Sequence, residues 1–317
     1  MAALPRAARP AALVALPALL FLAVWGTYLA ARGPFWLGSN LDPEYPYLLN
    51  GLSIASGSSP GHVDHPGTTV QLAVAGALRA SHALAGTGSL ADDVLSRPER
   101  YLHVAAWALL GLVALALAWA GLEARRATGS AAIALLVQAV PALSSRSLSQ
   151  LGGVRPEPLL LALAAALAAL TLRSLAPGRQ PGARDAALLG AVVGLAACTK
   201  VTAAPLLLLP LLLVRRPGQR LAAAGAAALA FAASFAPAAS RLAAFAGFLG
   251  RIATHSGQYG AGAPGIRLTF TAADEWAYDA VSMPAPPLML SAPTPPSMML
   301  ATEFPVSVSS WPEPMML

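Results

Sequence analysis

Residues 11–31 read "AALVALPALLFLAVWGTYLAA" and contain no charged side chain. About 20 consecutive apolar residues are enough for one helix to cross the hydrocarbon core of a bilayer. Arg6 and Arg9 precede the stretch, as basic residues do in a signal peptide, but its apolar part exceeds the roughly 7–15 residues of a signal-peptide core. We therefore predict that residues 11–31 form an uncleaved first transmembrane helix.

The same kind of segment recurs along the chain. Of the 317 residues, 56% are hydrophobic and 11% are charged, and the mean hydropathy is +0.62. A water-soluble domain of this size needs a largely polar surface, which this composition does not supply. The apolar segments lie near residues 11–31, 67–86, 101–121, 130–145, 157–175, 185–199, 201–214 and 221–239. The sequence predicts an all-α fold, a polytopic membrane bundle of about seven transmembrane helices.

Segment 67–86 is the exception among these apolar stretches. It is short, and Gln71, Arg79, Ser81 and His82 within it are costly at bilayer depth. We predict that this segment is a helix lying along the outer membrane surface.

The distribution of arginine supports that placement. With segment 67–86 on the surface, half of the 20 Lys and Arg residues share the cytoplasmic side with only Glu123 and Asp185 among the 14 acidic residues. Cytoplasmic loops of membrane proteins carry such an excess of basic residues. The predicted topology has a cytoplasmic N-terminus, an outer loop at residues 32–100 and a second outer segment from Ser240.

Net charge and cysteine content exclude two other interpretations. The net charge is +6, but the arginines are scattered between apolar segments, which is typical of topology signals and contact with anionic lipids rather than nucleic-acid binding. The single cysteine, Cys198, excludes an internal disulfide.

The predicted topology gathers unusual polar residues at the outer side of the membrane. The first two are in "NLDPEYPYLLNGL" at residues 40–52, and the others follow in the outer loop or at outer turns. These candidates are Asp42, Glu44, Asp64, His65, Arg155, Glu157, Lys200, His255 and Tyr259. Acids and bases that share one membrane–water boundary indicate a catalytic or binding face.

The residues of the outer loop also have purely structural interpretations. Asp42, which precedes Pro43, has the position of a helix N-cap, and Glu44 would then complement the dipole of that helix. Asp64 and His65 precede Pro66 and could likewise mark the start of the helix at residues 67–86.

The residues at the outer turns have such alternatives too. Arg155 and Glu157 are spaced for a local salt bridge at a helix end, which would contribute little stability. Lys200 fits an interfacial lysine that extends its ammonium to water. His255 and Tyr259 fit packing within a loop.

The order of these elements resembles the GT-C glycosyltransferases. The elements are an N-terminal helix, a long outer loop opening on Asp-x-Glu-Tyr at residues 42–45, "DHP" at residues 64–66 and "TK" at residues 199–200. The protein O-mannosyltransferase and aminoarabinose-transferase branch is the most similar part of that superfamily. Residues 11–265 resemble the seven-helix module of that superfamily. We therefore assign residues 1–265 to one transmembrane module.

This resemblance implies a polyprenyl-phosphate-linked sugar as donor and transfer at the outer face of the cytoplasmic (inner) membrane. It implies that Asp42 is the base that deprotonates the acceptor, with Glu44 as a rival, and that Asp64 is a second acid. Lys200 and Arg155 would contact the donor phosphate.

Four more residues complete the predicted substrate-binding set, and these are His65, Glu157, His255 and Tyr259. We expect membrane lipids and an acceptor glycan, lipid or protein as partners, and no organic cofactor. Two acids two residues apart are weak support for a divalent metal.

Two other functions remain open on the sequence alone. A lipid or solute transporter or flippase would carry charges along a path through the bundle, but here the charges cluster at helix ends and no repeat of helix groups is visible. The second is an inactive, truncated membrane scaffold.

Composition changes after residue 265. Residues 266–317 are rich in Pro, Ser and Met and contain no apolar segment of helical length. We expect a separate tail that is disordered or the product of truncation or a shifted reading frame.

Overall fold

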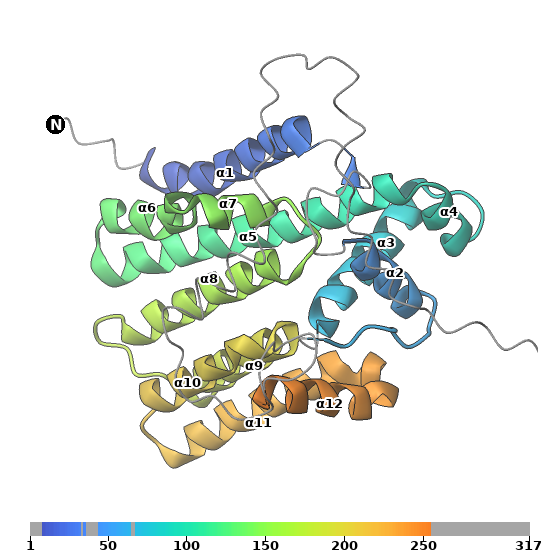
Figure 1. The fold of residues 1–317 in the computed structure, drawn as a ribbon. Coiled ribbons are helices and arrows are strands. Elements are labelled where there is room, and N and C mark those ends of the chain that lie inside the picture. The colour runs from blue at the N-terminus through green and yellow to red at the C-terminus, as the bar shows by residue number, and fades with distance from the viewer. Residues whose placement is uncertain (1–7, 33, 36–43, 65–66, 255–317) are drawn as a thin grey trace, which may run out of the picture. The chain divides into compact units, whose positions relative to one another are not determined.

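The computed structural model describes residues 8–32, 34–35, 44–64 and 67–254 (Figure 1). Within these ranges the regular structure is entirely helical. The helices are α1 Ala8–Arg32, α2 Glu44–Ala55, α3 Thr68–Ala85, α4 Leu90–Ser96, α5 Pro98–Thr128, α6 Ala131–Ala139, η2 Val140–Leu143, α7 Ser145–Leu151, α8 Pro156–Leu175, α9 Ala183–Thr199, η3 Val201–Leu207, α10 Leu208–Leu213, α11 Pro217–Phe235, η4 Ala236–Arg241 and α12 Leu242–Ala253. The predicted all-α fold is confirmed, and every predicted apolar segment is helical.

Length and composition separate these helices into two groups. Three helical stretches are long and apolar enough to cross a membrane, namely Pro98–Thr128, Pro156–Leu175 and Pro217–Ala253. Shorter apolar helices cover Leu13–Thr27, Ala131–Leu143 and Val201–Leu213. The predicted surface segment 67–86 is α3.

The longest helix, α5, has clear start and stop signals. Pro98 at its first position has the φ of a helix and no N–H to leave unsatisfied. Gly129 follows its last residue with φ 70°, a left-handed conformation that glycine adopts without strain. Ser130 then caps α6 by accepting a hydrogen bond from the backbone N–H of Ile133.

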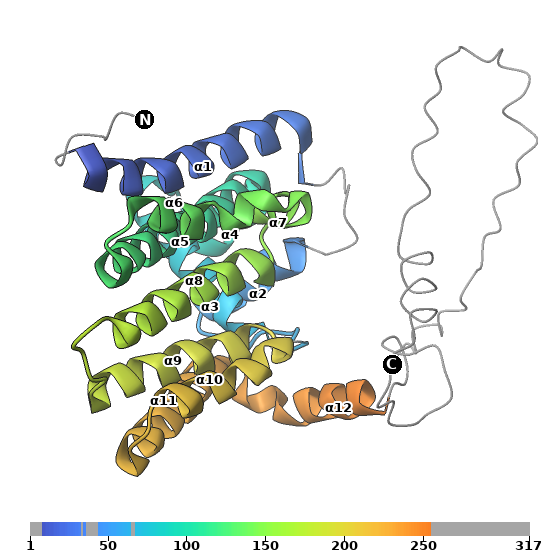
Figure 2. The ribbon, with the colours of Figure 1, turned by 90° about the vertical axis from the view of Figure 1, so that its left-hand side faces the viewer.

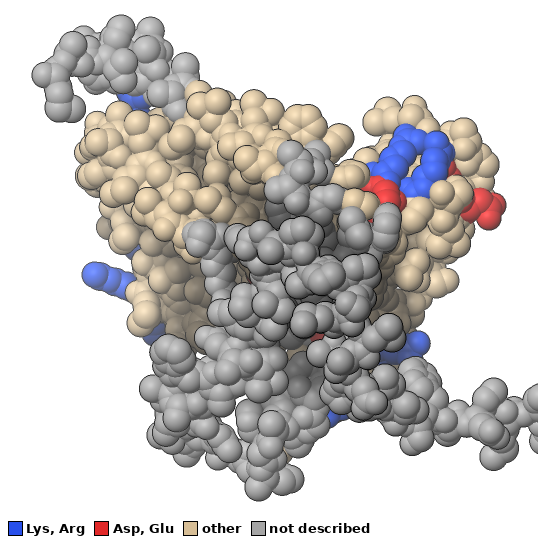
Figure 3. Space-filling model, turned by 45° about the horizontal axis from the view of Figure 1, so that its top comes forward, with Lys and Arg blue, Asp and Glu red and all other residues tan. Residues whose placement is uncertain are grey.

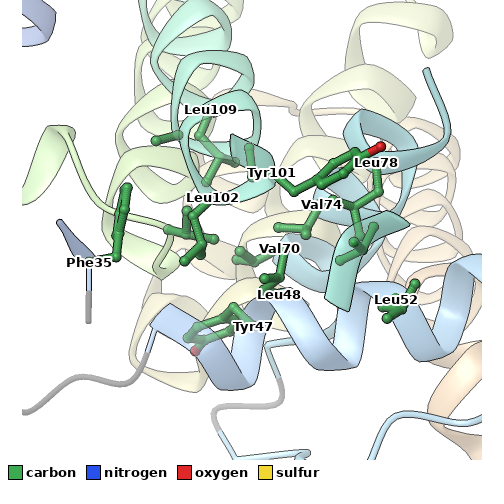
Figure 4. Packing of buried hydrophobic residues seen from close by; sticks show 14 of the residues in the cluster. Phe35, Tyr47, Leu48, Leu52, Val70, Val74, Leu78, Tyr101, Leu102 and Leu109 are labelled. Atoms are coloured by element: carbon green, nitrogen blue, oxygen red, sulfur yellow. The ribbon is translucent and has the colours of Figure 1, made fainter. Parts of the chain in front are cut away.

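Helices α5 and α8 form the centre of the bundle and run in the same direction. Leu102 and Leu159 share one buried cluster near the two helix starts, and Leu117 and Ala169 share another near the two ends. Figure 4 shows the first cluster, where side chains of α2 and α3 such as Leu48 and Val74 pack onto α5.

Helices α9 and α11 approach each other through small residues. A Cβ added to Gly190 would lie 2.0 Å from the carbonyl oxygen of Ala223, and one added to Gly194 would lie 2.2 Å from that of Ala227. Small residues spaced by four allow membrane helices to pack backbone to backbone. Figures 1 and 2 show α8, α9 and α11 side by side.

A hydrogen bond from α6 supports α1 at a proline. Pro17 has no N–H to donate to the carbonyl of Leu13, four residues earlier. Gln138 Nε2 donates to that oxygen over 2.6 Å and to Leu117 O over 3.2 Å. Gly121 makes room, because a Cβ there would lie 2.2 Å from Gln138 Nε2.

The directions of the helices place most basic turn residues at one end of the bundle. Helix α9 runs against α8, since Arg173 near the end of α8 lies 3.6 Å from Asp185 near the start of α9. Gln219 Nε2 of α11 donates to Pro181 O at this same end. The basic residues here are Arg125, Arg126, Arg173, Arg179, Arg184, Arg215, Arg216 and Arg220. The opposite end holds the starts of α5 and α8, the end of α9, and α2 and α3.

The face shown in Figure 3 is largely uncharged where described residues are visible, and charged side chains gather near α4. A surface with few charges is what a membrane-embedded bundle requires.

Candidate functional site

A buried ion pair joins α2 to the start of α8. Glu44 is the first residue of α2 and is 4% exposed, and Arg155 is the N-cap of α8 and is 2% exposed. Glu44 Oε1 lies 3.4 Å from Arg155 Nη2 and accepts a hydrogen bond from the backbone N–H of Val154 over 3.2 Å. Arg155 Nη1 also donates to Gln150. Buried charges are tolerated only with such partners.

Gly153 is the residue that lets this pair form. A Cβ at Gly153 would lie 2.3 Å from Arg155 Nε and 2.7 Å from Glu44 Oε1. Any side chain at this position would therefore displace the guanidinium or the carboxylate.

A second ion pair, more open to solvent, joins α8 to the end of α9. Lys200 follows the last residue of α9, and its Nζ lies 2.8 Å from Glu157 Oε1. The side chains of Lys200 and Glu157 are 27% and 28% exposed. Arg155 and Glu157 thus form ion pairs with Glu44 and Lys200, respectively, rather than the local salt bridge with each other that the sequence left open.

The start of α3 lies against the end of α9. Thr68 Oγ1 is 3.0 Å from Cys198 Sγ, and Thr69 Oγ1 donates to Leu195 O over 3.3 Å. Gly67 is the N-cap of α3, has a left-handed conformation and has no side chain with which to cap the helix. The loop that contains Asp64 therefore leads directly to the part of α9 that carries Lys200.

Two polar residues that were not among the predicted site residues, Glu99 and Asn50, form hydrogen bonds at the same end of the bundle. Glu99 of α5 accepts hydrogen bonds from Tyr45 Oη over 2.7 Å and from the backbone N–H of Phe35 over 2.9 Å. Burial, together with the hydrogen bond to Glu99, raises the pKa of Tyr45 from 10.0 to about 12. Asn50 Oδ1 accepts from the backbone N–H of Gly61 over 2.7 Å, which holds the loop after α2.

Of the predicted site residues, the structure brings together Glu44 with Arg155 and Glu157 with Lys200. Asp64 lies in the loop before α3. The remaining predicted residues, Asp42, His65, His255 and Tyr259, are outside the described residues.

Metal ligands are not clustered in the part of the chain described above. No group of three or more His, Cys, Asp or Glu side chains there has a spacing that could hold a metal ion. The paired side chains can bind an anionic or hydroxyl-bearing ligand through the ammonium of Lys200 and the carboxylate of Glu157.

Residues 95–301 match the model of glycosyltransferase family 87. This range includes Arg155, Glu157 and Lys200, whereas Glu44 and Asp64 precede it, and it continues past residue 266, where the composition changes. Neither a curated protein nor a solved structure shows significant similarity to the chain.

Proposed function

Since the chain belongs to glycosyltransferase family 87, a GT-C-type membrane family, we propose that it transfers a sugar from a polyprenyl-phosphate donor to an acceptor at the outer face of the cytoplasmic membrane. Membership of this family accounts for the glycosyltransferase activity. The class of sugar donor and the side of the membrane on which transfer takes place are what we propose. One observation carries it, namely the solvent-reachable Lys200–Glu157 pair at the end of the bundle opposite the arginine-rich turns.

The charge distribution supports the outer face. Basic residues flanking membrane helices favour the cytoplasmic side, and most basic turn residues of the bundle are at the end away from Lys200. The order of motifs, similar to that of the O-mannosyltransferase and aminoarabinose-transferase branch, supports a lipid-phosphate donor.

In the proposed reaction, the acceptor hydroxyl oxygen forms a bond to the anomeric carbon of the sugar. The bond between that carbon and the phosphate oxygen breaks, and its electron pair stays with the polyprenyl phosphate. The hydroxyl proton passes to a carboxylate, for which Asp42 is the first candidate and Asp64 the second.

Glu44 has a different role in this proposal. It is buried against Arg155 and the backbone of Val154, so a proton on Glu44 would break a buried ion pair. We assign Glu44 and Arg155 to positioning, because they hold the start of α2, two residues after Asp42 in the sequence, against α8.

Lys200 stabilises the leaving phosphate. Its fixed positive charge lowers the energy of negative charge that develops on the phosphate oxygen, without any proton transfer. His65, His255 and Tyr259 stay candidates for binding the sugar or the acceptor, which is a glycan, a lipid or a protein.

The direct test is transfer of radiolabelled sugar from polyprenyl-phosphate donors by membranes that contain the full chain. Asp42→Asn should reduce kcat by a factor of about 10²–10⁴, the usual contribution of a general base. Lys200→Gln should reduce kcat/KM, and Glu123→Gln, at the opposite end of the bundle, should leave both constants unchanged. Transfer that persists at the native rate in both Asp42→Asn and Lys200→Gln would refute the assignment.

A further inference from the structure

The two ion pairs of the site differ in how firmly they are held. Glu44 and Arg155 are almost completely buried and have further partners in Val154 and Gln150. The pair of Lys200 and Glu157 has side chains more than a quarter exposed. The first pair is therefore part of the framework, and the second can exchange partners with a ligand.

Glu157 is incompletely satisfied in its present position. Its Oε1 accepts from Lys200, while its Oε2 is buried without a hydrogen-bond partner in the described part of the chain. A buried carboxylate oxygen without a donor is destabilising. The ammonium of Lys200 is the main partner that stabilises the carboxylate, and the backbone N–H of Glu157 and the charge of Arg155 add to it.

The backbone at the start of α8 offers little to an anion. Helix N-termini commonly bind phosphate through free N–H groups, but Pro156 and Pro158 have none. The N–H of Val154 is used by Glu44, and the N–H of Glu157 interacts with its own carboxylate. An anion at this end of α8 must therefore be held by side chains, among which Lys200 is the accessible cation.

The four charges of the two pairs cancel. Glu44 neutralises Arg155 and Glu157 neutralises Lys200. A phosphate that reached Lys200 with Glu157 still in place would lie beside a like charge in a partly desolvated site, which is unfavourable. Donor binding then requires that Glu157 leave the ammonium.

We infer that Glu157 is a placeholder for the donor phosphate: its carboxylate occupies Lys200 in the empty site and is released when the lipid phosphate binds. This inference rests on the proposed function, because the ligand is the phosphate of the proposed donor and product. It assigns Glu157 to the control of phosphate affinity rather than to the transfer step itself.

The test is equilibrium binding of radiolabelled polyprenyl monophosphate to the purified full chain in lipid nanodiscs. Glu157→Gln keeps the size of the side chain and removes its charge, so Kd should fall by about tenfold, as expected when one charge-assisted contact no longer has to be broken. Lys200→Gln should raise Kd by at least about tenfold. Glu123→Gln removes an acid that is paired with Arg126 at the other end and should leave Kd unchanged.

A double variant separates partner exchange from a general gain of positive charge. In the Lys200→Gln background, Glu157→Gln should give no tighter binding, because the ammonium that Glu157 occupies is gone. The same gain with and without Lys200 would overturn the inference. If Glu157→Gln does not fold, Glu157→Asp, whose shorter side chain withdraws from Lys200, serves in its place with the same expected direction.

Failure of the inference and failure of the proposed function look different. Native-like binding that Glu157→Gln leaves unchanged or weakens would refute the placeholder role and leave the donor class standing. Absence of binding by both the native chain and Glu157→Gln would refute the lipid-phosphate donor and the placeholder together.

Discussion

Glu44 and Arg155, which are far apart in sequence, form an ion pair that solvent hardly reaches. The pair connects α2 to the central helix α8, so the position of α2 depends on it. Removing one partner leaves a buried charge without compensation, which typically destabilises a protein by about 3–5 kcal/mol.

We therefore expect Glu44→Ala to lower the free energy of unfolding by about 3–5 kcal/mol. Glu157→Gln, in the more exposed pair, should cost about 1 kcal/mol or less. Denaturant unfolding of the purified chain in detergent, followed by circular dichroism, measures both. Equal losses for the two variants would contradict the distinction between a framework pair and an exchangeable pair.

Gly153→Ala tests the space on which the buried pair depends. The added methyl group would overlap Arg155 Nε and Glu44 Oε1, and such overpacking typically costs about 1–3 kcal/mol. Gly225→Ala in α11 is the matched control, since a Cβ there meets nothing within 4 Å and alanine favours a helix. A loss of thermal stability in Gly225→Ala that equals that in Gly153→Ala would show that the close approach at Gly153 is unimportant.

Gln138 and Pro17 should be coupled. Gln138→Leu leaves the carbonyl of Leu13 without a donor, which should cost about 1–3 kcal/mol of unfolding free energy. Pro17→Ala restores a backbone N–H to the helix, so the loss caused by Gln138→Leu should be smaller in the Pro17→Ala background. A double-mutant cycle from unfolding midpoints measures the coupling, and strict additivity would argue against it.

The hydroxyl of Tyr45 should titrate unusually late. With a folded-state pKa of about 12 against an ordinary 10.0, its contribution to stability is fully present below pH 10.0 and is lost as pH rises towards 12. The difference in tyrosinate absorbance between the native chain and Tyr45→Phe should have its midpoint near 12. Glu99→Gln should lower that midpoint only in part, because burial is the largest cause of the shift.

The helices could be predicted from sequence because length and apolar composition are local properties. Segment 67–86 illustrates both the success and its limit. Its polar residues indicated a helix distinct from the spanning segments, and α3 is indeed a helix. What the local pattern could not supply is that Val70 and Val74 of α3 pack with α2 and α5 in one buried cluster. Helix α12, a short helix after η4, was not predicted.

The candidate site shows the same limit for side chains. The spacing of Arg155 and Glu157 pointed to a local pair, yet each binds a partner from another helix. Partner choice follows from the directions in which α2 and α9 meet α8, which no single segment encodes. Glu99 was missed for the same reason, since its partners Tyr45 and Phe35 precede it by more than fifty residues.

The central claim is that the end of the bundle carrying Lys200 and Glu157 faces away from the cytoplasm. Ser58 lies exposed in the loop after α2, and Gly218 lies exposed at the arginine-rich end. In intact cells, a membrane-impermeant thiol reagent should label Ser58→Cys and spare Gly218→Cys, and the native chain, whose Cys198 is buried, is the blank. Labelling of Gly218→Cys with none of Ser58→Cys would contradict the account.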